Sequence, residues 1–252
     1  MIPIKTPAEL KCMRTACRLS AQILAEVAAQ IRPGTTTGEL DAFAAERMRA
    51  LGVVSAFFGY GGFPGYTCIS LNEEVVHGIP GPRAINAGDL VSVDLGVVAE
   101  GFIGDNATTV RVGAVDAESV RLCEVTEAAL AAGIAAARAG NRIGDVGHAV
   151  QTVAEAAGFG VVRDYCGHGV GRKLHEDPQI PNFGTPGKGP VLKPGMTLAI
   201  EPMVNQGTYQ VDVMPNRWTV QTRDRKRSAH FEHTVLVVPD GPAEILTCAE
   251  KK

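Results

Sequence analysis

The sequence has 252 residues and a mass of 26.5 kDa, and 45% of its residues are hydrophobic. A chain of this size can build a sizeable core in one domain or in two fused halves. The net charge of -3 and the pI near 6.1 exclude an electrostatic case for nucleic acid or membrane as partner, which favours small molecules or peptides. No apolar run approaches the ~18 residues of a membrane span, and the start lacks a signal-peptide pattern. We therefore expect a cytoplasmic protein.

Two helices are predicted near the start of the chain. Apolar residues at steps of three and four predict an amphipathic helix over residues 7 to 32, which the segment RPG (32–34) ends. A second helix is predicted from about Thr37, and Thr36 and Glu39 have the spacing of a capping box.

Two neighbouring strands are predicted in LVSVDLGVVAEGFIGDN (90–106), forming a hairpin that turns near Glu100 and Gly101. These apolar strands also carry Asp94 and Asp105. An aspartate beside a glycine most often ends a strand or forms a turn, but an unpaired carboxylate inside an apolar strand is costly. The two aspartates therefore require either a turn or a partner that compensates their charge.

An internal duplication links the two halves of the chain. Five residues of the segment 32–52 recur at matching places in 138–158, and the Ala-rich segment 116–139 supplies the long helix before the second copy. AGDLVSVD (87–94) aligns with PGMTLAIE (194–201) at nearly the same spacing. Each copy thus runs from a glycine through an apolar strand to a terminal carboxylate, Asp94 in one copy and Glu201 in the other.

The duplication predicts an α+β fold, in which a curved antiparallel sheet is covered by helices on its outer face. We expect a single catalytic domain over residues 1–252, with halves of about 1–115 and 116–252 related by a pseudo-twofold axis. This symmetry would bring the two acids toward a shared cleft, and junctions of this kind are favoured ligand sites.

Further polar residues lie in apolar or glycine-rich settings. YCGHGVGRKLHEDP contains His168 and His175, and SAHFEHTVLVV places Glu232 near the start of a strand. Together with the acids above, the chain offers four carboxylates and one or two imidazoles, donors that suit Mn, Fe, Co or Zn. One ion would use two or three of these ligands, whereas four neighbouring carboxylates without metal would repel one another and take up protons. Two ions about 3.5–4 Å apart would balance the negative charge of the four carboxylates and use all of the ligands. They would also lower the pKa of a bridging water for metal-assisted hydrolysis.

Five segments in order resemble one family over nearly the whole chain: CISLNEEVVHGIPGPR, VSVDLGVVAEGFIGDNATTVRVG, GHGVGRKLHEDPQIPN, GMTLAIEPMV and EHTVLVV. They resemble type I methionine aminopeptidases, the bacterial enzymes that remove initiator methionine. The resemblance implies the pita-bread fold and two divalent ions, Co, Mn, Fe or Zn. It also implies action on nascent peptide or protein N-termini whose second residue is small, through a metal-bridging water or hydroxide that attacks the peptide carbonyl. We expect a monomer, although the sequence leaves the oligomeric state open.

The resemblance also implies roles for individual residues. Asp94 matches a ligand of one metal, His168 and Glu201 match ligands of the other, and Asp105 and Glu232 match the bridges between them. Two histidines match catalytic residues that contact the substrate: His77 near the scissile amide and His175 at the carbonyl oxygen. The residues that match the methionine pocket or its rim are Tyr60, Phe63, Cys68 and Trp218, and thioether contact with rings and a cysteine is physically reasonable.

The chain departs from many relatives at four positions. It has Gly61, Phe63, Leu174 and His230 where those relatives have His, Tyr, Phe and Gln, respectively. The first three bear on the shape of the pocket and not on the reaction. His230 is two residues from Glu232, so on a strand both face the same side. We expect it to lie behind the ligands or at the surface, although a ligand role is open, and we expect His233 to face the other way.

Alternative interpretations remain at this stage. The basic segment QTRDRKRS (221–228) is either a solvated hairpin tip, which we favour, or a transient contact to ribosomal RNA. A proline-specific peptidase of the same fold and a non-catalytic pita-bread binding protein are the rival functions. The presence of all five ligands argues against the non-catalytic protein. The start of the N-terminal helix within ten residues of Met1 argues against the proline-specific peptidase.

Overall fold

The computed structural model describes residues 1–248, and four helices cover its strands. The predicted capping box of Thr36 with Glu39 begins α2 (Thr37–Ala50), and a second one, Thr6 with Glu9, which was not predicted, begins α1 (Pro7–Ala28). The first helix ends at Ala28 rather than continuing to residue 32, because residues 29–34 form turns whose backbone bonds reach back to the last helical carbonyls. The other two helices are α3 (Ala117–Ala136) and α4 (Ile143–Ala156).

The strands form one large sheet and two small ones, and every pairing between strands is antiparallel. The nine-stranded sheet has the order β1-β4-β5-β14-β9-β7-β8, with β15 on β14 and β2 on β4. Its members are β1 (Val54–Ser55), β2 (Cys68–Leu71), β4 (Leu90–Ala99), β5 (Phe102–Arg111), β7 (Gly167–Gly169), β8 (Glu176–Ile180), β9 (Thr197–Ile200), β14 (Glu232–Leu236) and β15 (Glu244–Ile245).

The two small sheets flank one end of the large sheet. One has the order β13-β10-β6 and the other β11-β12-β3. A short 3₁₀ helix, Tyr60–Gly62, also precedes β2. The strands of the small sheets are β3 (Glu74–Val76), β6 (Gly160–Val161), β10 (Met203–Asn205), β11 (Val211–Val213), β12 (Val220–Thr222) and β13 (Ser228–His230).

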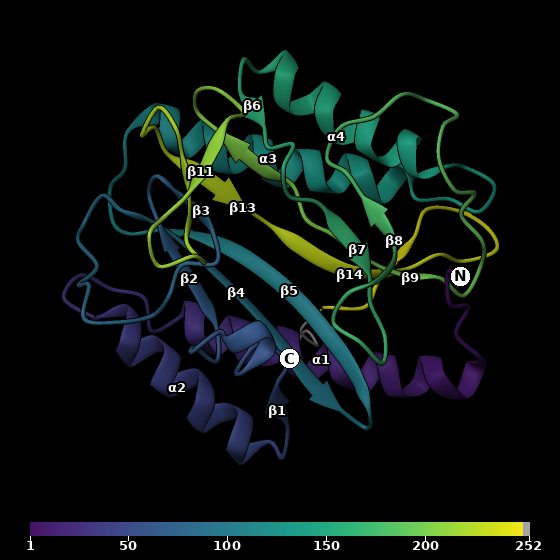
Figure 1. Cartoon of the computed structure of the whole chain (residues 1–252), viewed down its shortest axis with the longest axis horizontal. Coiled ribbons are helices and arrows are strands. Elements are labelled where there is room, and N and C mark those ends of the chain that lie inside the picture. Colours follow the sequence, from purple (N-terminus) through teal and green to yellow (C-terminus); the bar gives the residue numbers. More distant parts are fainter. Residues whose placement is uncertain (249–252) are drawn as a thin grey trace.

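The hairpin of β4 and β5 turns at Glu100 and Gly101 as predicted, and its ten-residue strands pair along their whole length. Both turn residues have positive φ, 52° and 76°, which a tight two-residue turn requires. Figure 1 shows the hairpin curving through the middle of the molecule, with α1 and α2 on one side and α3 and α4 on the other. The predicted α+β fold with a curved antiparallel sheet and helical cover is therefore confirmed.

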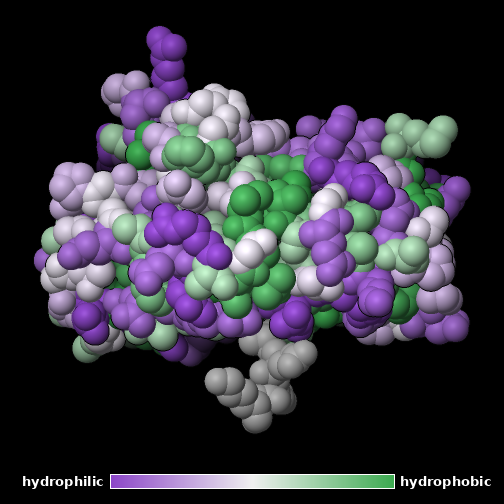
Figure 2. Space-filling view, turned by 90° about the horizontal axis from the view of Figure 1, so that it is seen from below, coloured by the Kyte–Doolittle hydropathy of each residue, from purple (hydrophilic) through white to green (hydrophobic). Residues whose placement is uncertain are grey.

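Two hydrophobic cores lie between the helices and the sheet. The first packs Met13 and Ile23 of α1 and Leu40 of α2 against β4, and the second packs Leu130 of α3 and Val146 of α4 against β9 and β14. The surface beneath α1 and α2 is mostly hydrophilic, with a hydrophobic area near its centre (Figure 2). Within residues 1–248, no helix is both long and apolar enough to cross a membrane.

Candidate active site

The register of the large sheet places three of the predicted ligands on one face. Ala107 of β5 pairs with Asp94 of β4 on one side and with Glu232 of β14 on the other. Residues opposite one another in an antiparallel pair point to the same face of the sheet, as do residues two apart on one strand. Asp94, Asp105 and Glu232 therefore share a face. Cys68 of β2 extends the same row, because it pairs with Asp94.

The other two predicted ligands reach this face from β7 and β9. Ala199 of β9 pairs with both His168 and Thr234, which lies two residues beyond Glu232. Glu201 lies two residues beyond Ala199, directly after the end of β9. The pairings of neighbouring strands thus align the acids and the histidine, although they are far apart in the sequence.

The glycines on both sides of His168 explain how β7 fits between its neighbours. A Cβ atom on Gly167 would lie 2.3 Å from the carbonyl oxygen of Ala199, and one on Gly169 would lie 2.2 Å from that of Asp177. No side chain fits at these distances, so the sequence GHG lets the backbone of β7 approach β8 and β9 closely.

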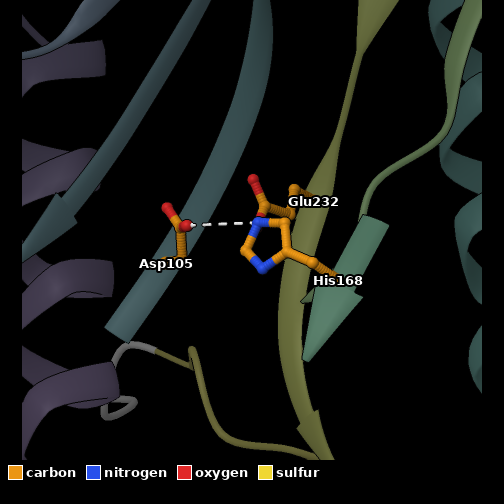
Figure 3. Close-up of side chains that lie close together, drawn as sticks. All are labelled: Asp105, His168 and Glu232. Atoms are coloured by element: carbon orange, nitrogen blue, oxygen red, sulfur yellow. Dashed lines mark ion pairs between the residues drawn. The ribbon is translucent and has the colours of Figure 1, made fainter. Parts of the chain in front are cut away.

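Three side chains converge at the centre of the face, as Figure 3 shows for Asp105, His168 and Glu232. One ligand atom from each lies within 4.8 Å of the others. The Nε2 atom of His168 is 3.8 Å from Asp105 Oδ2 and 3.5 Å from Glu201 Oε1. Its Nδ1 atom lies 3.0 Å from the carbonyl oxygen of Gly169, a contact that fixes the ring and leaves Nε2 toward the acids.

The electrostatics of this cluster are those of carboxylates crowded away from water. Burial raises the pKa of Asp105 to about 7. Burial and then neighbouring acids raise the pKa values of Asp94, Glu201 and Glu232 well above their usual range. For His168, burial lowers the pKa to about 4, so the imidazole is neutral and has a free lone pair at neutral pH.

The cluster fits divalent cations. Asp94 Oδ1, Asp105 Oδ1 and Glu232 Oε1 are buried without a hydrogen-bond partner among residues 1–248. Buried polar atoms normally have partners, and here three unpaired oxygens belong to residues that the sequence predicts as ligands. Oxygen donors with one neutral imidazole are a suitable set for Mn, Fe, Co or Zn, and bound cations would stabilise the ionised carboxylates.

His77 and His175 lie at the same cavity as the acids. His175 precedes β8, and its ring centroid is 4.4 Å from that of His168. Its Nδ1 atom is 2.7 Å from the Tyr60 hydroxyl. His77 follows β3 with an unusual positive φ of 59°. A Cβ on the next residue, Gly78, would lie 2.1 Å from the carbonyl oxygen of Ile69, so the close backbone approach that places His77 here requires glycine.

The remaining predicted pocket residues line the apolar part of this cavity, which has a volume of about 290 Å³. Phe63 and Trp218 meet edge to face with their centroids 5.1 Å apart, and Cys68 lies beside them at the cavity wall. Gly61 leaves the room that Trp218 occupies, since a Cβ there would be 3.3 Å from the indole ring. Leu174 also lines the cavity.

Other cavity residues were not predicted from the sequence: Phe57, Val76, Tyr165, Cys166 and Met203. The Tyr165 ring meets His77 edge to face, with centroids 5.6 Å apart. Tyr165 could have been predicted as a cavity residue because it lies three residues before His168, and a loop that places one residue in a site often places others there.

The structure corrects one expectation near the site and decides between two alternatives for another residue. The segment 221–228 is no hairpin tip, because β12 pairs with β11 and β3 whereas β13 pairs with β10. Its charges are also partly paired: Arg223 contacts Asp212, and Arg227 contacts Asp116. Of the two positions expected for His230, behind the ligands or at the surface, the structure shows the buried one, with its side chain 1% exposed. As predicted, His233 faces away from the acids, where it contacts Thr247.

Comparison with known proteins agrees with this geometry. The model of metallopeptidase family M24 matches residues 11–239. The chain belongs to this family. It is 49% identical over 247 residues to methionine aminopeptidase 1 of Bacillus subtilis (strain 168), covering 98% of this chain and 99% of that protein. It is 45% identical over 251 residues to the methionine aminopeptidase of Clostridium acetobutylicum, covering 99% and 100%.

Solved structures of the family have the same fold. The crystal structure of methionine aminopeptidase from Thermotoga maritima matches with a TM-score of 0.96 and 50% identity, over 98% of this chain and 99% of that one. Prolidase from Pyrococcus furiosus matches with a TM-score of 0.79 and 26% identity, over 98% of this chain and 66% of that one. These findings confirm the pita-bread fold and the resemblance to methionine aminopeptidases, and the M24 member described here is a metal-dependent peptidase.

Proposed function

We propose that this M24 peptidase removes the initiator methionine from nascent proteins and peptides whose second residue is small. One observation carries the proposal: two buried carboxylates, Asp105 and Glu232, two partly buried ones, Asp94 and Glu201, and a neutral His168 converge at a cavity with an apolar aromatic wall. Identities of 45–49% to methionine aminopeptidases over nearly the full chain support it and do not favour a proline-specific peptidase or a non-catalytic protein.

The proposed cofactor is a pair of divalent cations held by five residues. We assign Asp94 to one cation, His168 and Glu201 to the other, and Asp105 and Glu232 to both. The unpaired oxygens of Asp94, Asp105 and Glu232 support this assignment, as does the 3.5 Å between His168 Nε2 and Glu201 Oε1. Bound cations would lower the pKa of a water and polarise the scissile carbonyl.

The apolar wall would hold the methionine side chain. A thioether is polarisable and contacts aromatic ring edges favourably, and Phe63 and Trp218 present such edges beside Cys68. Because Phe63 is buried and has no hydroxyl group, this ring offers a hydrophilic first side chain no hydrogen bond. The contact would place the first residue so that its peptide bond lies beside the acids.

His77 and His175 would act on the peptide itself. Burial lowers the pKa of both imidazoles, that of His77 to about 4, so each is neutral at pH 7 and carries one N–H. If Tyr60 donates its hydroxyl hydrogen to Nδ1 of His175, the N–H of that ring is at Nε2. His175 would then donate this N–H to the peptide carbonyl oxygen, where negative charge develops in the transition state. His77 would contact the scissile amide.

The proposed partners and location follow from the substrate. Nascent protein N-termini are made in the cytoplasm, so we place the enzyme there, as a monomer that meets its substrates during or after synthesis. A transient contact of the segment 221–228 with the ribosome is compatible with its exposed residues, since Asp224, Arg225 and Lys226 lie at the surface.

The test is peptide hydrolysis by protein that has been stripped of metal and then supplied with Mn²⁺ or Co²⁺. We expect the tripeptide Met-Ala-Ser to be cleaved after its first residue, Met-Ile-Ser to resist, and the dipeptide Ala-Pro to remain intact. An oversized second residue would shift the peptide bond, and small misplacements cost large factors in rate. Cleavage of Ala-Pro but not of Met-Ala-Ser would replace this proposal with a proline-specific peptidase.

A further inference from the structure

His230 is a buried histidine whose ring nitrogens have no hydrogen-bond partner in the described part of the chain. Its side chain is 1% exposed. Leaving a buried polar group unpaired costs about 1–3 kcal/mol, so a hydrophobic residue would pack here at lower cost if packing were the only requirement. A histidine in this position therefore calls for a role that packing does not explain.

The backbone of His230 is held from both sides by one hydroxyl group. The His230 N–H donates to Thr109 Oγ1 at 2.9 Å, and Thr109 Oγ1 lies 2.8 Å from the His230 carbonyl oxygen, to which it donates. His230 also pairs with Met203 between β13 and β10. Because its backbone is fixed and its side chain is buried, the imidazole of His230 has few other positions available.

The nearest acid to His230 is Glu201, whose carboxylate lies between two imidazoles. Glu201 Oε1 is 3.5 Å from His168 Nε2, and Glu201 Oε2 is 3.8 Å from His230 Nε2. His168 and Glu201 line the cavity, but His230 is absent from the residues that line it in the described part of the chain. Each oxygen of Glu201 thus faces a different histidine, and only one of these histidines reaches the cavity.

We infer that His230 is a positioning residue for the metal centre, which donates its Nε2–H to Glu201 Oε2 and so fixes the direction in which Oε1 faces the cation. The inference rests on the proposed function, since it assumes that Glu201 binds a cation. Partners that orient a ligating carboxylate raise metal affinity because the ligand loses less freedom on binding. The gap of 3.8 Å must shorten to about 3 Å for the hydrogen bond to form.

The test is a calorimetric titration of metal-free, folded protein with Mn²⁺. We expect His230→Met, which is of similar length but has no N–H donor, to weaken binding by about ten- to a hundred-fold, the range typical for partners of metal ligands. His230→Gln restores a side-chain N–H and should stay within about threefold of the wild type. His233→Met is the matched control, because His233 directly follows Glu232, faces the other side of the strand and contacts Thr247; it should bind Mn²⁺ as the wild type does.

Each outcome of this titration is decisive. Wild-type affinity in His230→Met, or equal weakening in the Met and Gln variants, would overturn the positioning role. Loss of one whole ion per chain in His230→Met, with the other site unchanged, would make His230 a ligand instead. If His230→Met does not fold, His230→Asn replaces it, since its shorter amide falls short of Glu201 and should bind weakly. Failure of the wild type to bind Mn²⁺ would contradict the proposed function itself.

Discussion

The two halves of the chain deliver their carboxylates to the site in different ways. Asp94 and Asp105 are short side chains within the ten-residue strands β4 and β5, which pair with one another along their full length. Glu201 follows a strand of four residues, and Glu232 begins a strand of five. The aspartates extend from the middle of a rigid hairpin, whereas the glutamates reach the same place from strand ends with one more methylene group.

This difference indicates which ligands depend on other side chains for their position. A residue inside a long paired strand is positioned by the ladder on both sides, but one at a strand end is positioned on one side only. Glu201 has additional neighbours that compensate: its backbone carbonyl accepts from Asn182 Nδ2 at 2.9 Å, and its carboxylate faces His168 and His230. We therefore regard the hairpin as the fixed side of the site and the Glu201 side as the side whose geometry depends on other side chains.

The largest expected effect is the loss of an acid proposed to contact both cations, one from each half. Asp105→Ala and Glu232→Ala should each lower kcat/KM by more than about a hundred-fold, because losing even an indirect partner of a metal ligand costs about ten- to a hundred-fold. Metal analysis of each purified variant should show reduced content. Full metal content with normal turnover in either variant would contradict the assignment. A loss of metal in only one of the two variants would show that the two halves of the chain do not contribute equally to metal binding.

The next effect concerns the two histidines that we place on the substrate. His77→Ala and His175→Ala should keep their metal but lower kcat by about a hundred-fold or more, as expected when a donor to the transition state is removed. Steady-state kinetics beside metal analysis separates this outcome from loss of the cofactor. A variant that loses metal would place its histidine among the ligands.

A smaller effect is expected for Tyr60→Phe, which removes the hydroxyl group beside His175 and keeps the ring. One hydrogen bond contributes about 0.5–1.5 kcal/mol, so kcat should fall by about two- to tenfold with little change in KM for Met-Ala-Ser. The matched control is Tyr209→Phe, an exposed tyrosine outside the cavity, which should have wild-type kinetics. An effect on KM alone would mean that Tyr60 binds substrate without orienting His175.

The smallest effect is on the stability of metal-free protein. Burial raises the pKa of Asp105 from its usual 3.8 to about 7. As pH rises from about 4 to about 7, the unfolded chain loses this proton while the folded chain keeps it, so the fold loses stability over that window. The other three acids shift in the same direction. The buried histidines, whose pKa values are lowered, shift stability in the opposite direction, so the effect of the acid must be measured against Asp105→Asn, which does not titrate. Between pH 5 and 7 the melting temperature of the metal-free wild type should fall by a few degrees relative to that variant, at about 2–4 °C per kcal/mol.

Added Mn²⁺ should reverse that fall, since the cation stabilises the ionised acids. The gain in melting temperature on adding Mn²⁺ should be larger at pH 8 than at pH 6. A melting-temperature difference between metal-free wild type and Asp105→Asn that stays constant from pH 5 to pH 7 would contradict the raised pKa of Asp105.

The parts of this arrangement that depend on neighbouring residues in the sequence were predictable. The capping boxes at Thr6 and Thr36 and the turn at Glu100 depend on neighbouring residues, and strand alternation places Asp94 and Asp105 on one face. The position of β14 between β5 and β9 was not predictable, because it depends on pairings with strands that are not its neighbours in the sequence, one of them more than a hundred residues earlier. For the same reason the segment 221–228 was wrongly predicted as a hairpin, and the burial of His230 beside Glu201 was left open.

The most direct test of the metal centre is to titrate metal-free protein with Mn²⁺ while following both ions bound per chain and hydrolysis of Met-Ala-Ser. We predict that protein without metal is inactive, that activity returns as cations bind, and that binding saturates at two ions per chain. Asp105→Ala in parallel should reach neither the stoichiometry nor the activity. Turnover that is unchanged by complete removal of metal would contradict the account.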